Sequence, residues 1–327
     1  MFDQDYLKRR IDEEVLNSLK GEPEVIYQAS SHLLRGGGKR LRPLILLAFS
    51  SLLGGNIEWS LPLAAGIELF HNFTLIHDDI MDEDEYRRGL KTVHVIWGIP
   101  LAILAGDLLF SKAFEKFSKA NIDSGLLVKA LKVFVDASIM VSEGQALDII
   151  YSSKPLGELR EKDYLNVIIK KTAYLFSASS KIGAIIATGN EEEISRAELY
   201  GLNLGIAFQI RDDIIGLTES SEITGKPQYS DLREGKRTIL IIKAMEFGNE
   251  EERKEIERVL GNKLCSISDF ERVVKIIERT GSLDYAINMS KRYANTALDH
   301  LEGITPKDEE AMQYLKKLVK SVVERRY

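Results

Sequence analysis

The stretch LPLAAGIELFHNFTLIHDDIMD, residues 61–82, decides the fold class of this chain. It is apolar on nearly all sides for several turns before it ends in a group of aspartates. A helix that is apolar on all sides must be covered by other elements, so the stretch predicts a central helix of an α-helical core. We expect Ser60 to cap this helix and Pro62 to lie in its first turn, where the N–H that proline lacks has no helical partner.

The rest of the chain also favours helices. Segment 103–120 repeats apolar residues at the spacing of a helix with one wide apolar face, and segment 198–217 is apolar on nearly all sides. No proline lies in 228–305, so long helices are permitted there. Gly, Pro, Asn and Ser cluster in short breaks that are typical of loops, at 35–38, 53–56, 152–157, 224–236 and 303–306. We therefore predict an all-α protein that forms a single domain over residues 1–327.

Charge and composition exclude several classes of protein. Lys and Arg number 44 against 50 Asp and Glu, so the chain lacks the positive charge of a general nucleic-acid binder. The single cysteine, Cys265, excludes an internal disulfide and a cysteine-based zinc cluster, and it fits a reducing compartment. The N-terminal residues are charged throughout, unlike a signal peptide, and no apolar run of about 18 residues predicts a membrane span. We expect a cytoplasmic protein.

An acidic cluster ends the central helix. Asp78 and Asp82 are one helical turn apart with Asp79 beside them, and Arg87 and Arg88 follow. Magnesium prefers carboxylate oxygens and keeps positions for phosphate oxygens, so acids beside arginines predict a site for magnesium and a diphosphate. The alternative is an acidic helix end on the surface. The apolar turns before the cluster favour a cavity instead.

A second buried helix ends in a similar way. In GLNLGIAFQIRDDIIG, residues 201–216, Asp212 and Asp213 end an apolar run, and Gln209 lies about one turn earlier. If both acidic ends lie at one mouth, their carboxylates can hold magnesium ions around one diphosphate. We make this the central structural hypothesis.

Basic residues recur in glycine-bearing loops. The loops are RGGGKRLRP at 35–43, TGKP at 224–227 and REGKRT at 233–238. Glycine allows the backbone to approach an anion, although each loop alone could be a solvated basic turn. None is a nucleotide-binding P-loop, because Arg40 follows Gly38-Lys39 where Ser or Thr is required. Lys171 and Thr172 lie within the otherwise apolar segment 164–182, where a cation is costly unless an anion pairs with it.

Six motifs together resemble those of one family, the trans-prenyltransferases that include farnesyl and geranylgeranyl diphosphate synthases. In chain order they are GGGKRLRP, HDDIMDEDEYRRG, GQALD, KKTAYLF, GIAFQIRDD and DLREGKRT, within about residues 32–240. The resemblance implies the isoprenoid synthase fold, with roughly a dozen helices around a deep central cavity, as a homodimer. It also implies head-to-tail condensation of isopentenyl diphosphate with dimethylallyl, geranyl or farnesyl diphosphate.

The resemblance assigns roles to the matching positions. Asp78, Asp82 and Asp212 would hold magnesium, about two or three ions in all, with Asp79 and Asp213 in support. The residues expected to contact the allylic diphosphate are Arg87, Lys171, Thr172, Gln209, Lys226 and Lys236, of which Lys171 and Lys226 would be catalytic together with the aspartates. Those expected to hold isopentenyl diphosphate are Lys39, Arg42, His71 and Arg88.

The implied mechanism has three steps. The allylic diphosphate ionises, the isopentenyl double bond attacks the carbocation, and a proton leaves to the departing diphosphate. One departure from the family pattern concerns the second motif, usually D-D-x-x-D, which ends here in Gly216. We expect metal binding to survive with a water in place of the missing carboxylate.

Product length follows from residues upstream of Asp78. In this family a bulky side chain there closes the cavity, and Phe73 lies five residues before Asp78 with Thr74 four before. Phe73 lies about 7.5 Å below Asp78 along the helix. An aromatic at the fifth position alone resembles archaeal geranylgeranyl diphosphate synthases, so the twenty-carbon product is favoured over farnesyl or longer products. Phe73 could instead be ordinary core packing.

Three rival functions have less support. A metal phosphohydrolase could use His77 and Asp78 as an adjacent pair with His32 or His71. It would leave the second acidic helix and the basic loops unexplained. A non-catalytic partner subunit usually loses its acidic motifs, and a terpene cyclase normally lacks the GGGKRLRP and DLREGK loops.

Overall fold

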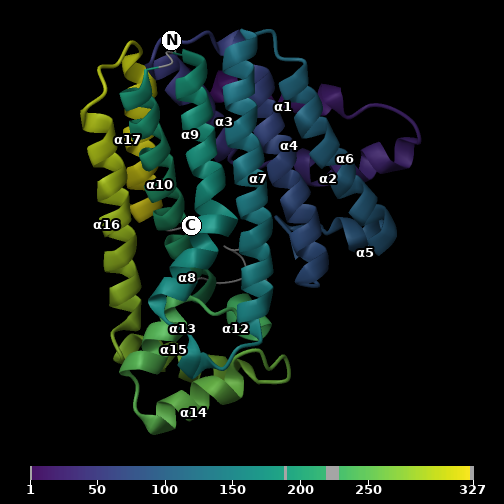
Figure 1. Cartoon of the computed structure of the whole chain (residues 1–327). Helices are drawn as coiled ribbons and strands as arrows, with labels where there is room; N and C mark the ends of the chain where they lie inside the picture. The colour runs from purple at the N-terminus through teal and green to yellow at the C-terminus, as the bar shows by residue number, and fades with distance from the viewer. Residues whose placement is uncertain (1, 188–189, 219–227, 325–327) are drawn as a thin grey trace. The chain divides into compact units, whose positions relative to one another are not determined.

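The computed structural model describes residues 2–187, 190–218 and 228–324 (Figure 1). Over these residues the chain is nearly all helical, so the all-α prediction is confirmed. The helices are α1 Gln4–Ser18, α2 Glu24–Arg35, α3 Leu41–Leu52, α4 Ile57–Met81, α5 Val93–Trp97, α6 Ile99–Ser118, α7 Ser124–Ser152, α8 Glu161–Ile168, α9 Tyr174–Ala187, α10 Glu191–Thr218, α12 Ser230–Glu234, α13 Ile239–Phe247, α14 Glu250–Val259, α15 Ile267–Arg279, α16 Ser282–Glu302 and α17 Glu309–Glu324. A 3-10 turn spans Leu156–Glu158, and the strands that the described residues form are β1 Tyr86–Arg87 and β2 Leu90–Lys91.

The chain divides into two compact units. Unit 1 comprises Met1–Val135, Ala178–Glu198 and Gly303–Lys316, and unit 2 comprises Asp136–Ser177, Leu199–Glu302 and Lys317–Tyr327. Boundaries between them fall inside α7, α9, α10 and α17, and one falls between α16 and α17, at Glu302 and Gly303. The prediction of a single domain over 1–327 stays a prediction, and each unit is described by itself.

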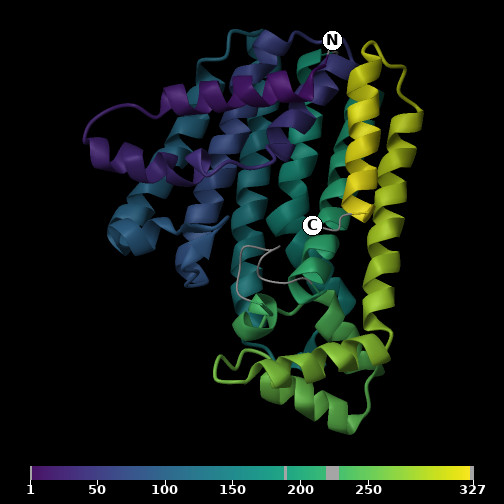
Figure 2. The same cartoon turned by 180° about the vertical axis from the view of Figure 1, so that it is seen from behind.

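Helix α4 is the core of unit 1 and packs against α3 and α6 (Figure 1). Leu63, Ile67 and Leu69 have no exposed surface, so the predicted burial is confirmed. Figure 2 shows α1 and α2, the two purple helices, beside each other in the same unit.

The predicted start of this helix is wrong by one turn. Asn56 is the cap, and its side chain accepts the N–H of Glu58 at 2.9 Å. Ser60 is buried within the helix, where its hydroxyl lies 2.7 Å from that of Ser50. Pro62 is tolerated inside α4 because it removes only one hydrogen bond close to the helix start.

Unit 2 has its own apolar core. Residues of α13 pack against α16, and α14 and α15 lie side by side next to them (Figure 2). On α10, Leu204, Ala207 and Ile210 are fully buried, as the apolar segment 198–217 predicts. The predicted loop at 224–236 is partly wrong, because its residues Ser230–Glu234 form α12.

The segment expected to form one helix over 164–182 is interrupted. Between α8 and α9, residues Ile169–Ala173 form a π-helical turn, which contains Lys171 and Thr172. Gly144 on α7 lies against this turn, and a Cβ atom built on it would lie 2.2 Å from the backbone nitrogen of Lys171. Only glycine permits that approach. Such π turns are frequent at functional sites, because the extra residue redirects side chains.

Among the helices that the structure describes, none combines the length and the hydropathy needed to cross a lipid bilayer.

Candidate active site

The first acidic cluster lies at the end of α4 in unit 1. Asp82 is the residue after the last turn, and its N–H donates to the Asp78 carbonyl at 2.8 Å. The helical spacing therefore continues through Asp82, and the two acids lie one turn apart as predicted. Both are partly exposed, whereas Asp79 is completely buried.

Asp79 is the counterion of an arginine. The β1–β2 hairpin returns the chain so that Arg87 Nε donates to Asp79 Oδ1, and Asp84 lies 3.5 Å from the same guanidinium. Burial alone would lower the pKa of Arg87, but Asp79 outweighs it and the pKa is raised. Asp79 thus fixes Arg87 beside the two exposed acids, which fits a supporting role.

A group of basic residues lies near this cluster. Arg42 Nη1 donates to His71 Nε2 at 3.1 Å, and Arg88 Nη1 donates to the Gly37 carbonyl of the loop that carries Lys39. Burial lowers the pKa of His71 well below its usual range, and Arg42 and Arg88 add to the effect. His71 is therefore a neutral ring among cations. Of the residues predicted for isopentenyl diphosphate, the structure thus brings Arg42, His71 and Arg88 together, and Lys39 belongs to the loop that Arg88 contacts.

Arg40 organises this loop, and sequence reasoning gave it no role. Its side chain is 2% exposed and contacts Asp12 at 2.6 Å and Glu68 at 3.1 Å. It also donates to the backbone carbonyls of Gly37 and Leu34 at 2.9 and 2.8 Å. A buried guanidinium with acidic and carbonyl partners holds the loop in one conformation. Only its place between Lys39 and Arg42 could have drawn attention to it.

In unit 2 a single carboxylate gathers two of the predicted lysines. Asp148 Oδ2 lies 2.7 Å from Lys171 Nζ and 3.8 Å from Lys236 Nζ. Burial works to raise the pKa of Asp148, but the two lysines outweigh it and lower the pKa. Asp148 belongs to GQALD, the motif to which the sequence assigned no residue role. Lys226 lies outside the described residues.

The second acidic cluster, at the end of α10, rests on a buried hydrogen-bond chain. Thr172 donates to Gln209 at 2.8 Å, Gln209 donates to Asp213 Oδ1 at 2.8 Å, and Tyr164 donates to Asp213 Oδ2 at 2.7 Å. Burial, followed by the charge of Asp231, raises the pKa of Asp213 to about 8. Asp213 is therefore held by neutral donors, whereas Asp212 is partly exposed. The sequence did not suggest Tyr164.

The comparisons with known proteins agree with this arrangement. The family model for polyprenyl synthetase matches residues 23–277. The chain belongs to the polyprenyl synthetase family. It is 45% identical over 318 residues to the geranylgeranyl diphosphate synthase of Sulfolobus acidocaldarius, covering 97% of this chain and 96% of that one. It is 42% identical to the geranylfarnesyl diphosphate synthase of Aeropyrum pernix, covering 96% and 99%. The crystal structure of the Pyrococcus horikoshii geranylgeranyl pyrophosphate synthetase matches with a TM-score of 0.92 and 39% identity over 98% of both chains.

The resemblance inferred from the six motifs is thereby confirmed, as is the isoprenoid synthase fold. The expectation that the two acidic helix ends share one mouth concerns both units and stays a prediction.

The donor set fits the magnesium that the family implies. In residues 2–187, 190–218 and 228–324, no three His, Cys, Asp or Glu side chains are arranged to hold a metal by themselves. Magnesium does not need such a cage, because it usually takes one or two carboxylates and completes its shell with phosphate oxygens and water. Asp78 and Asp82, with oxygen donors and partial exposure, meet that requirement. A polyprenyl synthase from Caulobacter crescentus, with a TM-score of 0.91 and 33% identity, is complexed with calcium and isoprenyl diphosphate.

The histidines do not support a metal phosphohydrolase. His77 Nε2 donates to the Ile103 carbonyl at 3.1 Å, and His71 accepts from Arg42. His32 contacts the Lys91 carbonyl at 2.8 Å. The three rings therefore bond to three different protein groups and do not converge on one point where a metal ion could bind.

Phe73 is the first ring of an aromatic cluster below Asp78. Its ring centroid lies 5.4 Å from that of Phe70 and 5.3 Å from that of Phe110 on α6. Phe110 and Phe134 continue the cluster within unit 1. Thr74 is not part of this aromatic cluster, and its hydroxyl donates to the His71 carbonyl.

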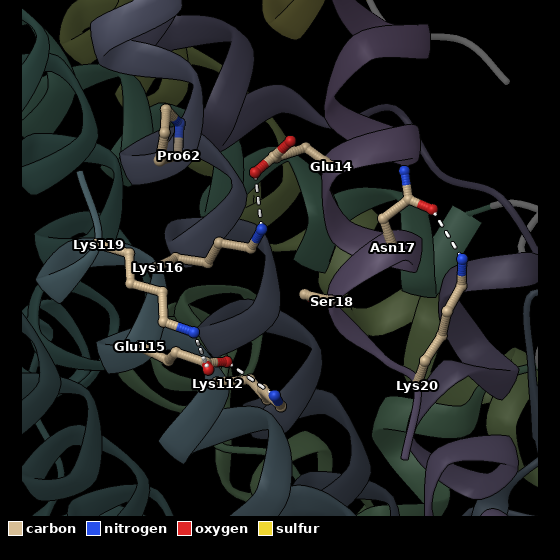
Figure 3. A pocket seen from close by; sticks show the side chains of 9 residues that line it. All are labelled: Glu14, Asn17, Ser18, Lys20, Pro62, Lys112, Glu115, Lys116 and Lys119. Atoms are coloured by element: carbon tan, nitrogen blue, oxygen red, sulfur yellow. Dashed lines mark hydrogen bonds and ion pairs between the residues drawn. The ribbon is translucent and has the colours of Figure 1, made fainter. Parts of the chain in front are cut away.

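A hollow of about 360 Å³ elsewhere in unit 1 contains none of the predicted residues (Figure 3). It is lined by Glu14, Asn17, Ser18, Lys20, Pro62, Lys112, Glu115, Lys116 and Lys119. Its lysines form ion pairs, Lys116 with Glu14 at 2.7 Å and Lys112 and Lys119 with Glu115 at 2.7 and 2.6 Å. Cations near the end of α6 also balance the helix dipole. The hollow is a structural feature of the α1–α6 contact.

Proposed function

We propose that this chain condenses isopentenyl diphosphate head to tail with dimethylallyl, geranyl and farnesyl diphosphate to make geranylgeranyl diphosphate. The observation that carries the proposal is an acidic helix end, Asp78 and Asp82, beside the basic group of Arg42, Arg88 and the glycine loop. Two polyanionic substrates require both a metal site and a separate basic site. The similarity to geranylgeranyl diphosphate synthases over nearly the full length supports the same substrates.

The residues proposed to hold magnesium are Asp78, Asp82 and Asp212, with about two or three ions in all. When bound, the ions supply Lewis-acid stabilisation of the leaving diphosphate. Asp79 and Asp213 fix the surroundings of these acids through Arg87 and Tyr164. The negative charge that develops on the diphosphate is then stabilised by groups that are already oriented towards it.

The allylic diphosphate is proposed to bind Lys171, Lys236 and Arg87, together with Thr172, Gln209 and Lys226. Lys171 and Lys236 share Asp148, so their ammonium groups are held at one place before substrate arrives. As the allylic carbon–oxygen bond breaks, both lysines neutralise the departing oxygens. Asp148 keeps them from turning away, which makes it a positioning residue.

Isopentenyl diphosphate is proposed to bind Lys39, Arg42, Arg88 and His71. Its double bond attacks the allylic carbocation, a carbon–carbon bond forms, and the proton lost from the isopentenyl unit goes to the released diphosphate. Because His71 is half-buried among arginines that lower its pKa, it serves as a hydrogen-bond partner and adds no charge. The apolar surroundings exclude water that would quench the cation.

Product length is proposed to depend on the aromatic cluster that begins at Phe73. A chain growing away from Asp78 meets this ring about 7.5 Å below the acids. Thr74 leaves the next position open. The similarity to geranylfarnesyl diphosphate synthases makes a longer product the alternative to the twenty-carbon one, with farnesyl diphosphate as the shorter alternative.

We further propose a cytoplasmic homodimer. Ile99, Ile103 and Leu104 on α6 are 52%, 42% and 52% exposed, and Val95 and Ile96 on α5 continue the same apolar surface. An exposed row of large aliphatic side chains favours cover by another protein surface, and a second copy supplies it. The single cysteine fits a reducing compartment.

The purified protein tests the proposal when it is incubated with isopentenyl diphosphate, one allylic starter at a time and Mg2+. Chromatography of the products is expected to show geranylgeranyl diphosphate from every starter and none after chelation of the metal. Phosphate release without a second substrate would instead support the phosphohydrolase, and a lack of any condensed product would refute the proposal.

Phe73→Ala tests the product-length proposal. Removing the ring opens the cavity below Asp78, so products longer than twenty carbons are expected with overall turnover largely kept. Phe247→Ala, which truncates an exposed ring in unit 2, is the matched control and keeps the product length. Identical product lengths for Phe73→Ala and wild type would show that the ring is ordinary packing.

A further inference from the structure

The second acidic helix end lacks a carboxylate at residue 216, and the structure shows what lies in that place. A Cβ atom built on Gly216 would lie 2.6 Å from Oδ2 of Asp231 and 3.2 Å from its Cγ. Asp231 is in the first turn of α12, Ser230–Glu234. The expectation of a water beside Gly216 stays a prediction, and the structure offers a protein group as a second candidate for that place. The Asp231 carboxylate occupies the space in which a side chain at 216 would begin.

This position is on the same side of α10 as Asp212, a proposed metal ligand. Residues 212 and 216 are one turn apart, so side chains at both positions project from the same face of the helix. Asp213 projects from a different face, and each of its oxygens accepts a hydrogen bond from Gln209 or Tyr164. The carboxylates that share the face are therefore those of Asp212 and Asp231.

Two carboxylates on one face are the donors that magnesium prefers. At the end of α4, Asp78 and Asp82 are one turn apart. On α10, the Asp231 carboxylate lies where a side chain one turn after Asp212 would begin. Acids placed close together repel each other, and a divalent cation between them removes the repulsion.

Resting on the proposed function, we propose that Asp231 supplies the carboxylate that residue 216 lacks, so that Asp212 and Asp231 together hold magnesium at the second acidic helix end. Gly216 then has a steric role, since any side chain there would displace Asp231. The DLREGKRT motif contributes an acid through Asp231 as well as a cation through Lys236.

The test measures the rise in melting temperature that Mg2+ and inorganic diphosphate produce together, with no reaction taking place. Asp231→Ala and Asp231→Asn are each expected to raise the Mg2+ concentration for half of the full rise by about tenfold or more. Gly216→Ala is expected to act in the same direction, because its methyl group pushes the carboxylate away. Asp299→Ala, which removes an exposed acid on α16, is the control and leaves the concentration unchanged.

A transplant separates a metal role from a structural role of Asp231 in α12. Asp231→Ala combined with Gly216→Asp moves the carboxylate onto α10 and is expected to recover most of the lost Mg2+ affinity. A double variant no better than Asp231→Ala, or an Asp231→Asn variant with the affinity of wild type, overturns the proposal. The proposed function is tested separately, by the condensation assay with wild-type protein. Its failure there can therefore be distinguished from a failure of the Asp231 proposal in the melting-temperature measurement.

Discussion

The acidic ends of α4 and α10 look alike in sequence, yet each buries its second aspartate in a different environment. Asp79 is paired with the charged guanidinium of Arg87, whereas Asp213 accepts hydrogen bonds from the neutral groups of Tyr164 and Gln209. At the first end, the buried carboxylate is paired with a cation whose pKa it raises. At the second end, burial and then the charge of Asp231 raise the pKa of Asp213 to about 8, although the hydrogen bonds from Tyr164 and Gln209 act in the opposite direction.

This difference indicates that the two helix ends differ in their electrostatic roles. The first end carries its own positive charge, with Arg87, Arg88 and Arg42 close by, and so it suits both metal and anion. The second end has an excess of carboxylates around Asp212. We infer that the second end depends more strongly on the metal for its electrostatic balance.

The largest effect is expected from Asp78→Ala. The variant removes a proposed metal ligand, so turnover is expected to fall by about a thousandfold or more. Steady-state condensation of geranyl diphosphate measures it, and binding of isopentenyl diphosphate should persist because its basic group is intact. Full activity in this variant would contradict the metal assignment at the first end.

Arg87→Met and Tyr164→Phe compare the two buried aspartates directly. Arg87→Met leaves the charge of Asp79 buried without its partner and is expected to lower the free energy of unfolding by about 3 kcal/mol or more. Tyr164→Phe removes one neutral donor from Asp213 and is expected to lower it by about 1 kcal/mol. Urea unfolding measures both variants. Equal losses would mean that the two environments do not differ as described.

His71→Gln gives the smallest effect, which depends on pH. The pKa of His71 is lowered in the folded protein, so the unfolded chain takes up a proton first as the pH falls below about 6.5. The stability of wild type should therefore fall there, by up to about 1.4 kcal/mol per pH unit from this residue. The difference in unfolding free energy between the two proteins at about pH 5 and pH 7.5 measures it. A pH-independent difference would contradict the assignment of a neutral ring.

Much of the fold was predictable because burial leaves a local signature. The apolar runs before Asp78 and Asp212 identified two central helices, on which residues such as Leu63, Ile67, Leu204 and Ile210 have no exposed surface. The start of α4 was missed because Asn56 and Ser60 are both good caps, and only the structure shows which side chain accepts a backbone N–H. The π turn at Ile169–Ala173 was missed because the apolar pattern continues through it.

The missed site residues have a common physical cause. Each of them makes its contact with a residue of another element. Asp148 accepts a hydrogen bond from Lys171, Tyr164 donates one to Asp213, and the carboxylate of Asp231 lies against Gly216. No periodicity links residues that lie many positions apart. The motifs contain Asp148, Lys171, Asp213 and Asp231 but do not show which residues are in contact, and Tyr164 lies outside them. The assignment of residues to isopentenyl diphosphate stays a prediction, although Arg42 and Arg88 both lie near His71 within unit 1.

The central claim is that the two acidic helix ends hold metal around one allylic diphosphate. A crystal structure with Mn2+ and an unreactive thio analogue of geranyl diphosphate tests it most directly, because the anomalous signal locates each ion. The account predicts ions about 2 Å from carboxylate oxygens of Asp78 and Asp82 and of Asp212, sharing oxygens of the same diphosphate. Ions at only one of the two helix ends, or a diphosphate bound away from both, would contradict it.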